Sequence, residues 1–122
     1  MCPAPCALRR ILKGKLTNCG QICIAPDYLL VPEDKVDTIA AQLLEIAREM
    51  YPEWDGNPDA TSIINARHMQ RLQALVEDAV AKGATVQTSH PFAPDTRMMP
   101  LTVLTDTTPE MEVMRDEIFG PI

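Results

Sequence analysis

The sequence of 122 residues has no apolar run long enough to cross a lipid bilayer, so it predicts no membrane-spanning helix. Its 11 basic residues are scattered and outnumbered by 17 acidic ones, which gives a formal net charge of -6 and argues against nucleic-acid binding. The N-terminal residues lack the continuous apolar core of a signal peptide. These absences predict a globular, cytoplasmic protein that binds neither nucleic acid nor membrane.

A glycine-rich phosphate loop is missing as well. No such loop follows an expected strand, and the residues from Gly14 to Gly20 fit neither the dinucleotide-binding nor the P-loop spacing. If the protein uses a nucleotide, most of the binding loop is expected to lie outside this chain.

The cysteines and histidines do not form a recognisable metal pattern. The cysteines fall into two pairs, Cys2/Cys6 and Cys19/Cys23. Neither histidine lies near a pair, so we predict no metal site, and in the cytoplasm the thiols are expected to be reduced. His68 is expected on the apolar face of a helix and His90 in a solvated loop, and neither is expected to be catalytic.

Hydrophobic periodicity and turn residues predict alternating helices and strands. Helices are expected over residues 7–19, 33–51 and 62–82, strands over 25–31, 84–87 and 101–104, and a short helical turn from 107. The run 25–31 does not alternate, which is typical of a strand covered on both faces in a parallel sheet. Residues 117–122 are expected to enter a further strand. The predicted fold class is α/β, with a mostly parallel sheet flanked by helices.

The stretch from Gly14 to Cys23 carries the clearest chemical signal. Gly20 is expected to stop the first helix, and Cys23 follows shortly before Pro26. A thiol at such a junction can be accessible, as a nucleophile must be. The alternative is that Cys19 and Cys23 are both small buried hydrophobic residues, and their spacing leaves both interpretations open.

This stretch resembles the nucleophile segment of the aldehyde dehydrogenase family, a Gly-Lys pair followed by Asn-x-Gly-Gln-x-Cys. The matching residues are Gly14, Lys15, Asn18, Gly20, Gln21 and Cys23. Residues 116–121 are similar to the family's Glu-Glu-Ile-Phe-Gly-Pro segment, with Asp116 in place of the first Glu. Residues 24–28, 62–68 and 100–104 resemble the branch that acts on coniferyl and fatty aldehydes. The resemblance covers residues 9–122 as a partial catalytic domain and leaves residues 1–8 as a divergent N-terminal segment.

The resemblance implies NAD(P)-dependent oxidation of an aldehyde to the carboxylic acid, with coniferyl aldehyde as a candidate substrate. Cys23 would be the catalytic nucleophile that forms the thiohemiacetal and thioester, and its backbone N–H would contribute to the oxyanion site. Glu117 would hold the nicotinamide ribose of NAD or NADP, and Phe119 would pack beside it. Cys19 would be non-catalytic. The family also implies a homo-oligomer in the full-length protein.

Several parts of the family's machinery are not in this sequence. The general-base Glu, the glycine-rich cofactor segment and the oxyanion Asn all lie upstream of the cysteine in the family. The chain is therefore expected to be a piece of a catalytic domain, inactive alone. Two alternatives remain open, a non-catalytic interaction or swapped-assembly module with exposed sheet edges, and a thiol-based redox or metal module.

Overall fold

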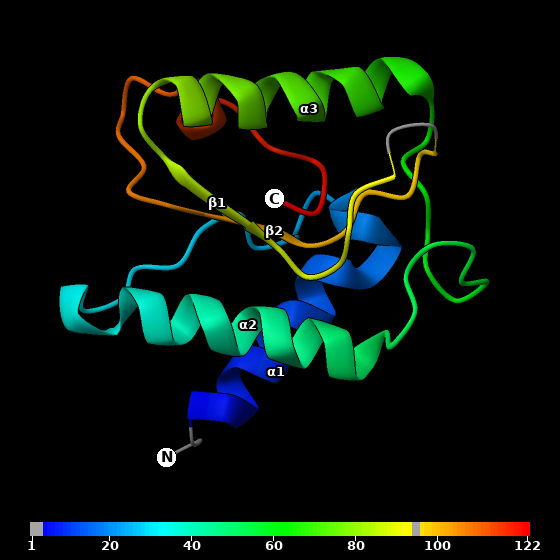
Figure 1. The fold of residues 1–122 in the computed structure, drawn as a ribbon, viewed down its shortest axis with the longest axis horizontal. Coiled ribbons are helices and arrows are strands. Elements are labelled where there is room, and N and C mark those ends of the chain that lie inside the picture. The colour runs from blue at the N-terminus through cyan, green and yellow to red at the C-terminus, as the bar shows by residue number, and fades with distance from the viewer. Residues whose placement is uncertain (1–3, 94–95) are drawn as a thin grey trace.

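The computed structural model describes residues 4–93 and 96–122. Its helices are α1 (Ala4–Leu16), α2 (Val36–Met50) and α3 (Ala66–Ala81), and its strands are β1 (Thr85–Thr88) and β2 (Thr102–Thr105). Short 3-10 turns cover η1 (Thr17–Gly20), η2 (Glu33–Lys35) and η3 (Glu112–Met114). All three predicted helices and two of the predicted strands are therefore present, with shifted ends (Figure 1).

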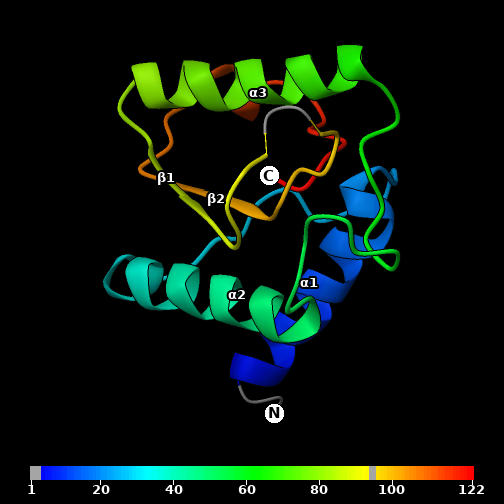
Figure 2. The ribbon, with the colours of Figure 1, turned by 45° about the vertical axis from the view of Figure 1, so that its right-hand side comes forward.

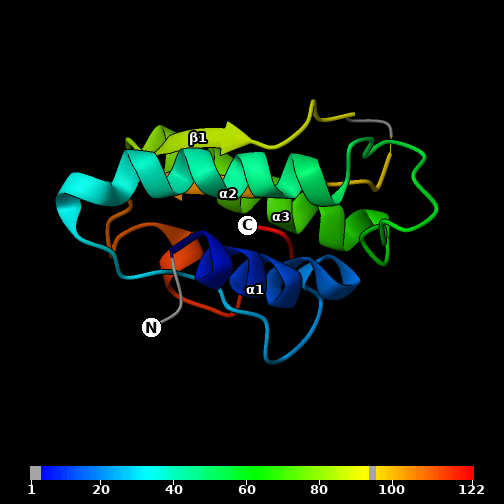
Figure 3. The same ribbon diagram turned by 90° about the horizontal axis from the view of Figure 1, so that it is seen from below.

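The two strands lie between α3 on one side and the other two helices on the opposite side (Figures 1 and 2). They pair antiparallel, with Thr85 opposite Thr105 and Thr88 opposite Thr102. Helices α1 and α2 pack against each other and run side by side when seen from below (Figure 3). The C-terminal segment lies beside the sheet, in the middle of the molecule (Figure 1).

Helix α2 forms where the apolar spacing predicts it. Glu33 and Asp34 precede it and favour the positive end of the helix dipole, and its apolar side chains recur on one face. The buried residues of α2 are Ala40, Leu43, Leu44, Ile46 and Ala47. The amphipathic pattern therefore decides which face of α2 packs into the core.

Helix α3 begins four residues later than predicted, at Ala66. The Asn65 side chain accepts a hydrogen bond of 2.9 Å from the His68 backbone N–H and caps the helix. The residues before the cap are bonded elsewhere, because the Ile63 N–H donates to the Arg97 carbonyl at 2.8 Å. A capping residue and a competing contact together set the start of α3.

The prediction of a mostly parallel sheet is wrong. The sheet has two strands in antiparallel order, and neither residues 25–31 nor residues 117–122 form a strand. A strand requires hydrogen bonds to a neighbouring strand, but the Ala25 N–H is bonded within a turn and residues 26–31 form no backbone hydrogen bond in the described ranges. The apolar residues of this segment therefore do not by themselves make it a strand, because they do not specify a neighbouring strand.

The core draws on both ends of the described chain. The largest fully buried side chains are Leu12, Ile63, Leu72, Met111, Pro100, Pro121 and Cys19. The core positions the end of α1 directly against the C-terminal segment.

None of the helices in residues 4–93 and 96–122 combines the length and the apolar character needed to cross a membrane.

Candidate active site

The chain reverses after α1 through a left-handed turn. Asn18, Cys19 and Gly20 have φ values of 51°, 56° and 73°. Such values cost a non-glycine residue about 1–2 kcal/mol. The turn is held because the Gln21 N–H and side-chain amide both donate to the Asn18 carbonyl, at 3.1 and 3.0 Å. The Asn18 amide donates in return to the Gln21 carbonyl at 3.1 Å.

The Gln21 side chain also fixes this turn to the segment before α3. Its Nε2 donates to the Ser62 carbonyl at 3.2 Å, and its Oε1 accepts from the Ile64 N–H at 2.9 Å. Gln21 therefore holds two loops together from the position just before the cysteine turn. Its motif position was visible in the sequence, but this bridge across the fold was not.

Cys23 lies at the corner of the next turn. The Ala25 N–H donates to the Ile22 carbonyl at 3.0 Å, which closes a β-turn with Cys23 and Ile24 at its central positions. The Cys23 thiol is exposed, and the Ile24 side chain is 89% exposed. This turn presents the thiol to reagents from solvent.

Cys19, in contrast, is buried. Of the two interpretations of the sequence, an accessible thiol therefore fits Cys23 and a small buried hydrophobic residue fits Cys19. It is 1% exposed, and its Sγ lies 3.7 Å from the Met99 carbonyl oxygen. Burial raises the pKa of the Cys19 thiol to about 12, against a smaller opposing effect of the Lys15 cation. Cys19 is therefore the buried hydrophobic residue of the pair.

The buried thiol predicts a loss of stability at alkaline pH. The unfolded thiol ionises near its ordinary pKa of 9.0, whereas the folded thiol stays protonated until about 12. Between these values the folded state binds more protons, so the free energy of unfolding falls as pH rises. At pH 10 the loss due to Cys19 is about 1.4 kcal/mol. Urea unfolding at pH 7 and pH 10 measures it.

Cys19→Ala is the matched variant for this measurement, because it keeps every other titrating group. Burial lowers the pKa of Lys15, which raises the free energy of unfolding with pH in the range just below 10.5. Both proteins contain Lys15, so comparing them isolates the contribution of Cys19. The alkaline loss should be smaller in Cys19→Ala by the amount that Cys19 contributes. An equal loss in the two proteins would contradict this interpretation of the buried thiol.

The segment around Glu117 lies against the left-handed turn that precedes Cys23. A Cβ built on Gly20 would lie 2.2 Å from the Gly120 carbonyl oxygen, so the two glycine backbones are in direct contact. Glu117 is exposed, and Phe119 is half-buried with a φ of 51°. The two motifs that are distant in sequence are thus neighbours in the fold. The backbone contact requires a glycine at position 20, whereas a Cβ at Gly120 would instead meet the Leu72 side chain.

An ion pair between a buried Lys15 and a half-buried Asp27 supports the same junction. Lys15 Nζ lies 2.9 Å from Asp27 Oδ1, and Asp27 Oδ2 accepts from the Ile118 N–H at 3.1 Å. The Lys15 and Asp27 side chains are 5% and 24% exposed. Burial lowers the pKa of Lys15, and the hydrogen bond and charge of Asp27 oppose that shift. The role of Asp27 is not visible in the sequence, because no local pattern pairs residues 15 and 27.

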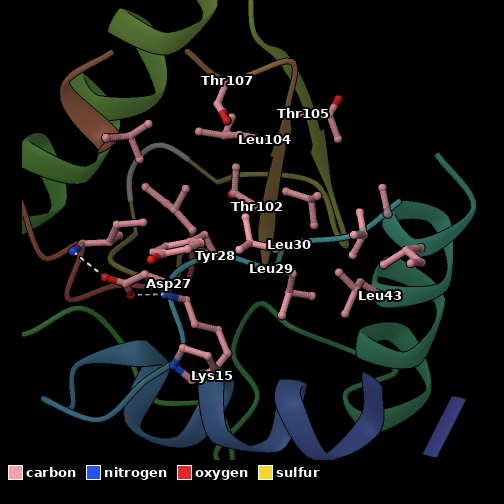
Figure 4. A pocket seen from close by; sticks show the side chains of 18 of the residues that line it. Lys15, Asp27, Tyr28, Leu29, Leu30, Leu43, Thr102, Leu104, Thr105 and Thr107 are labelled. Atoms are coloured by element: carbon pink, nitrogen blue, oxygen red, sulfur yellow. Dashed lines mark hydrogen bonds and ion pairs between the residues drawn. The ribbon is translucent and has the colours of Figure 1, made fainter. Parts of the chain in front are cut away.

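An open groove of about 830 Å³ lies beside this ion pair. Residues from α1, α2, β2 and the extended segment line it, together with Glu117 and Ile118. Tyr28 and Leu30 are 71% and 91% exposed along its wall, where Figure 4 shows them between Asp27 and β2. The groove brings apolar surface and charged groups together beside the Glu117 segment.

Neither histidine joins Cys23 or Glu117 through a hydrogen bond in the described residues. His68 is exposed rather than packed. The expectation of a solvated His90 is wrong, because its ring stacks on Trp54 at a centroid distance of 5.9 Å, and its Nδ1 lies 2.9 Å from Ser89 Oγ. The loop folds back onto Trp54, which loop composition does not predict.

The described ranges contain no group of three or more histidine, cysteine, aspartate or glutamate side chains arranged to hold a metal ion. Cys6 and Cys23 are exposed and Cys19 is buried, and all three are free thiols. Cys2 lies outside the described residues, so the predicted pair Cys2/Cys6 has no structural description.

Comparison with known proteins identifies the family. The sequence pattern of the aldehyde dehydrogenase family matches residues 5–122, and the chain belongs to this family. A coniferyl aldehyde dehydrogenase from a Pseudomonas species is 42% identical over 119 residues, covering 93% of this chain and 25% of that protein. Mouse aldehyde dehydrogenase family 3 member A2 is 41% identical over 122 residues, covering 99% of this chain and 24% of that protein.

Solved structures agree with the sequence matches. The substrate-bound AldH of Staphylococcus aureus has a TM-score of 0.81 and 37% identity, covering 95% of this chain and 25% of that chain. An NADP-dependent glyceraldehyde-3-phosphate dehydrogenase from Bacillus halodurans, complexed with NADP, has a TM-score of 0.82 and 28% identity, covering 97% of this chain and 25% of that chain. The chain thus spans about a quarter of the length of these relatives.

Proposed function

We propose that this chain carries the nucleophile of an NAD(P)-dependent aldehyde dehydrogenase, with Cys23 as the catalytic residue. The observation that carries the proposal is an exposed thiol on a β-turn, whose neighbouring left-handed turn contacts the Glu117 segment through Gly20 and Gly120. Family membership supports the reaction class. The proposed reaction is oxidation of an aldehyde to the carboxylic acid.

The turn gives Cys23 two groups that this reaction needs. The exposed Sγ can add to the aldehyde carbonyl carbon as the thiolate, which forms a thiohemiacetal on Cys23. The Cys23 backbone N–H donates to no backbone oxygen within the described ranges, so it is available to the oxygen that becomes negative during addition. The hydrogen bonds of the preceding turn hold both groups in place.

Glu117 and Phe119 are the residues proposed to contact NAD or NADP. The exposed Glu117 carboxylate forms no hydrogen bond or ion pair with the described residues, so it can accept hydrogen bonds from ribose hydroxyls. The half-buried Phe119 ring offers an apolar surface beside it. When bound, the cofactor accepts the hydride. We propose that the chain by itself adds aldehyde without completing the oxidation.

Coniferyl aldehyde is the proposed substrate, supported by the 42% identity to a coniferyl aldehyde dehydrogenase. The similar identity to aldehyde dehydrogenase family 3 member A2 keeps other aldehydes as candidates. A cytoplasmic location and homo-oligomerisation of the full-length protein are proposed from membership of the family. Each of these describes a protein of which this chain spans about a quarter.

Alkylation in the presence of an aldehyde tests the role of Cys23. The chain is treated with iodoacetamide with and without coniferyl aldehyde, and mass spectrometry of peptides measures modification at each cysteine. The aldehyde should slow alkylation of Cys23 more than that of Cys6, because only the Cys23 turn is proposed to bind an aldehyde. Cys6 is the matched control, since both thiols are exposed. Equal protection of Cys6 and Cys23 would contradict the proposal.

A second function, a pairing or swapped-assembly module, is favoured by one observation. The segment 25–31 carries exposed Tyr28 and Leu30, and among the described residues no backbone hydrogen bond involves residues 26–31. Such a segment can pair with a strand of another chain. Light scattering would distinguish the two functions, because a pairing module forms a defined oligomer and the catalytic proposal for the isolated chain does not require one.

A further inference from the structure

Each oxygen of the Asp27 carboxylate contacts a different part of the fold. Oδ1 lies 2.9 Å from Lys15 Nζ at the end of α1, and Oδ2 accepts the Ile118 N–H at 3.1 Å. Figure 4 shows Lys15 extending from α1 toward Asp27 beneath the groove. One side chain thus joins the helix that leads into the Cys23 turn to the segment that holds Glu117 and Phe119.

Ile118 is held at both of its backbone polar groups. Its N–H donates to Asp27, and its carbonyl accepts a hydrogen bond from the Arg71 guanidinium of α3. The next residue, Phe119, has a φ of 51°. A left-handed conformation at a phenylalanine persists only where its surroundings fix it. These two bonds, with the Gly20–Gly120 contact, supply that constraint.

The Lys15 side chain is 5% exposed, so its orientation depends on a partner inside the protein. Asp27 is the acceptor that the described residues provide. The ion pair holds one carboxylate oxygen on Lys15, and the second oxygen then accepts the Ile118 N–H. A simple surface ion pair would not fix a third group in this way.

We propose that Asp27 is a positioning residue, whose carboxylate sets the placement of the Glu117–Phe119 segment relative to the Cys23 turn. The inference rests on the proposed function, because that function gives Cys23, Glu117 and Phe119 their roles. Asp27 itself does not touch the reacting thiol. It acts through the Ile118 backbone on one side and through Lys15 on the other.

Two NMR measurements on the whole chain test the proposal. In a Cys2→Ser, Cys6→Ser chain, a nitroxide is attached to Cys23, and paramagnetic relaxation is measured at the amide protons of Glu117 and Phe119. Asp27→Asn has one acceptor oxygen for two donors, so the relaxation pattern should change. Hydrogen exchange of the Ile118 amide, measured without the label, should accelerate by roughly tenfold, as expected for a lost bond to a carboxylate.

Asp34→Asn is the matched control, because Asp34 pairs with Lys35 at the surface, with both side chains more than half exposed. It should change neither measurement. If Asp27→Asn is unfolded by circular dichroism, the variant Lys15→Met/Asp27→Leu replaces it, since it buries no unpaired charge and also lacks the bond to Ile118. Unchanged relaxation and exchange in the folded variant would overturn the proposal, even if its melting temperature falls.

These measurements are independent of the proposed function. Neither uses an aldehyde, so the relaxation and exchange measurements can still be interpreted if the alkylation test fails. Conversely, aldehyde protection of Cys23 with unchanged relaxation in the Asp27 variants would retain the nucleophile and reject Asp27 as a positioning residue. The two proposals can therefore fail separately.

Discussion

Gly20→Ala is expected to lower the free energy of unfolding by about 4 kcal/mol or more, a large part of the total stability of an ordinary domain. The new Cβ would lie 2.2 Å from the Gly120 carbonyl oxygen and 2.6 Å from its carbonyl carbon. Both are backbone atoms, so no side-chain rotation relieves the clash. The φ of +73° adds strain for any residue with a Cβ. Urea or thermal unfolding measures the loss.

Gly56→Ala is the matched control for this effect. Gly56 has nearly the same φ, +70°, but nothing lies within 4 Å of the position of its Cβ. Its substitution should therefore cost only the conformational strain, about 1–2 kcal/mol. The difference between the two variants measures the contact between the Cys23 and Glu117 segments. Equal losses would contradict the close approach of Gly20 and Gly120.

Asp27→Ala is expected to cost about 3–5 kcal/mol, because it leaves the Lys15 ammonium buried without its partner. The Ile118 N–H loses its acceptor in the same variant. Lys15→Met/Asp27→Leu removes both charges and should recover most of this loss, since apolar side chains of similar size can replace a buried pair. Urea unfolding of both variants measures the difference.

The exposed pair of Lys35 and Asp34 supplies the comparison for this prediction. Its side chains are 58% and 73% exposed, so Asp34→Ala should cost no more than about 0.5 kcal/mol. A similar loss for Asp27→Ala and Asp34→Ala would show that burial of Lys15 contributes little. A double variant no more stable than Asp27→Ala would instead indicate that the Ile118 bond dominates.

The sequence predicted the helices because their causes are local. The spacing of apolar residues in α2 and the capping side chain of Asn65 both act within a few residues of the helix. The exposed Cys23 and the buried Cys19 were not distinguished by spacing, because the intervening left-handed turn changes their relative directions. Resemblance to a family, rather than periodicity, singled out Cys23.

The pairing of strands and the Lys15–Asp27 bridge could not be read from local pattern. Residues 25–31 are apolar enough for a strand, but a strand also needs a neighbouring backbone, and the described chain places none there. The bond between Asp27 and Ile118 joins residues that are close only after folding. Such contacts depend on the packing of α1 against the C-terminal segment.

The most direct test of the account is an NMR spectrum of the chain with an aldehyde labelled with ¹³C at the carbonyl carbon. In the Cys2→Ser, Cys6→Ser background, we predict a new resonance of a thiohemiacetal carbon, because the exposed Cys23 thiol adds to the carbonyl while Cys19 stays buried. The resonance should disappear when Cys23→Ser is added. No resonance with Cys23 present, or one that survives its replacement, would contradict Cys23 as the nucleophile.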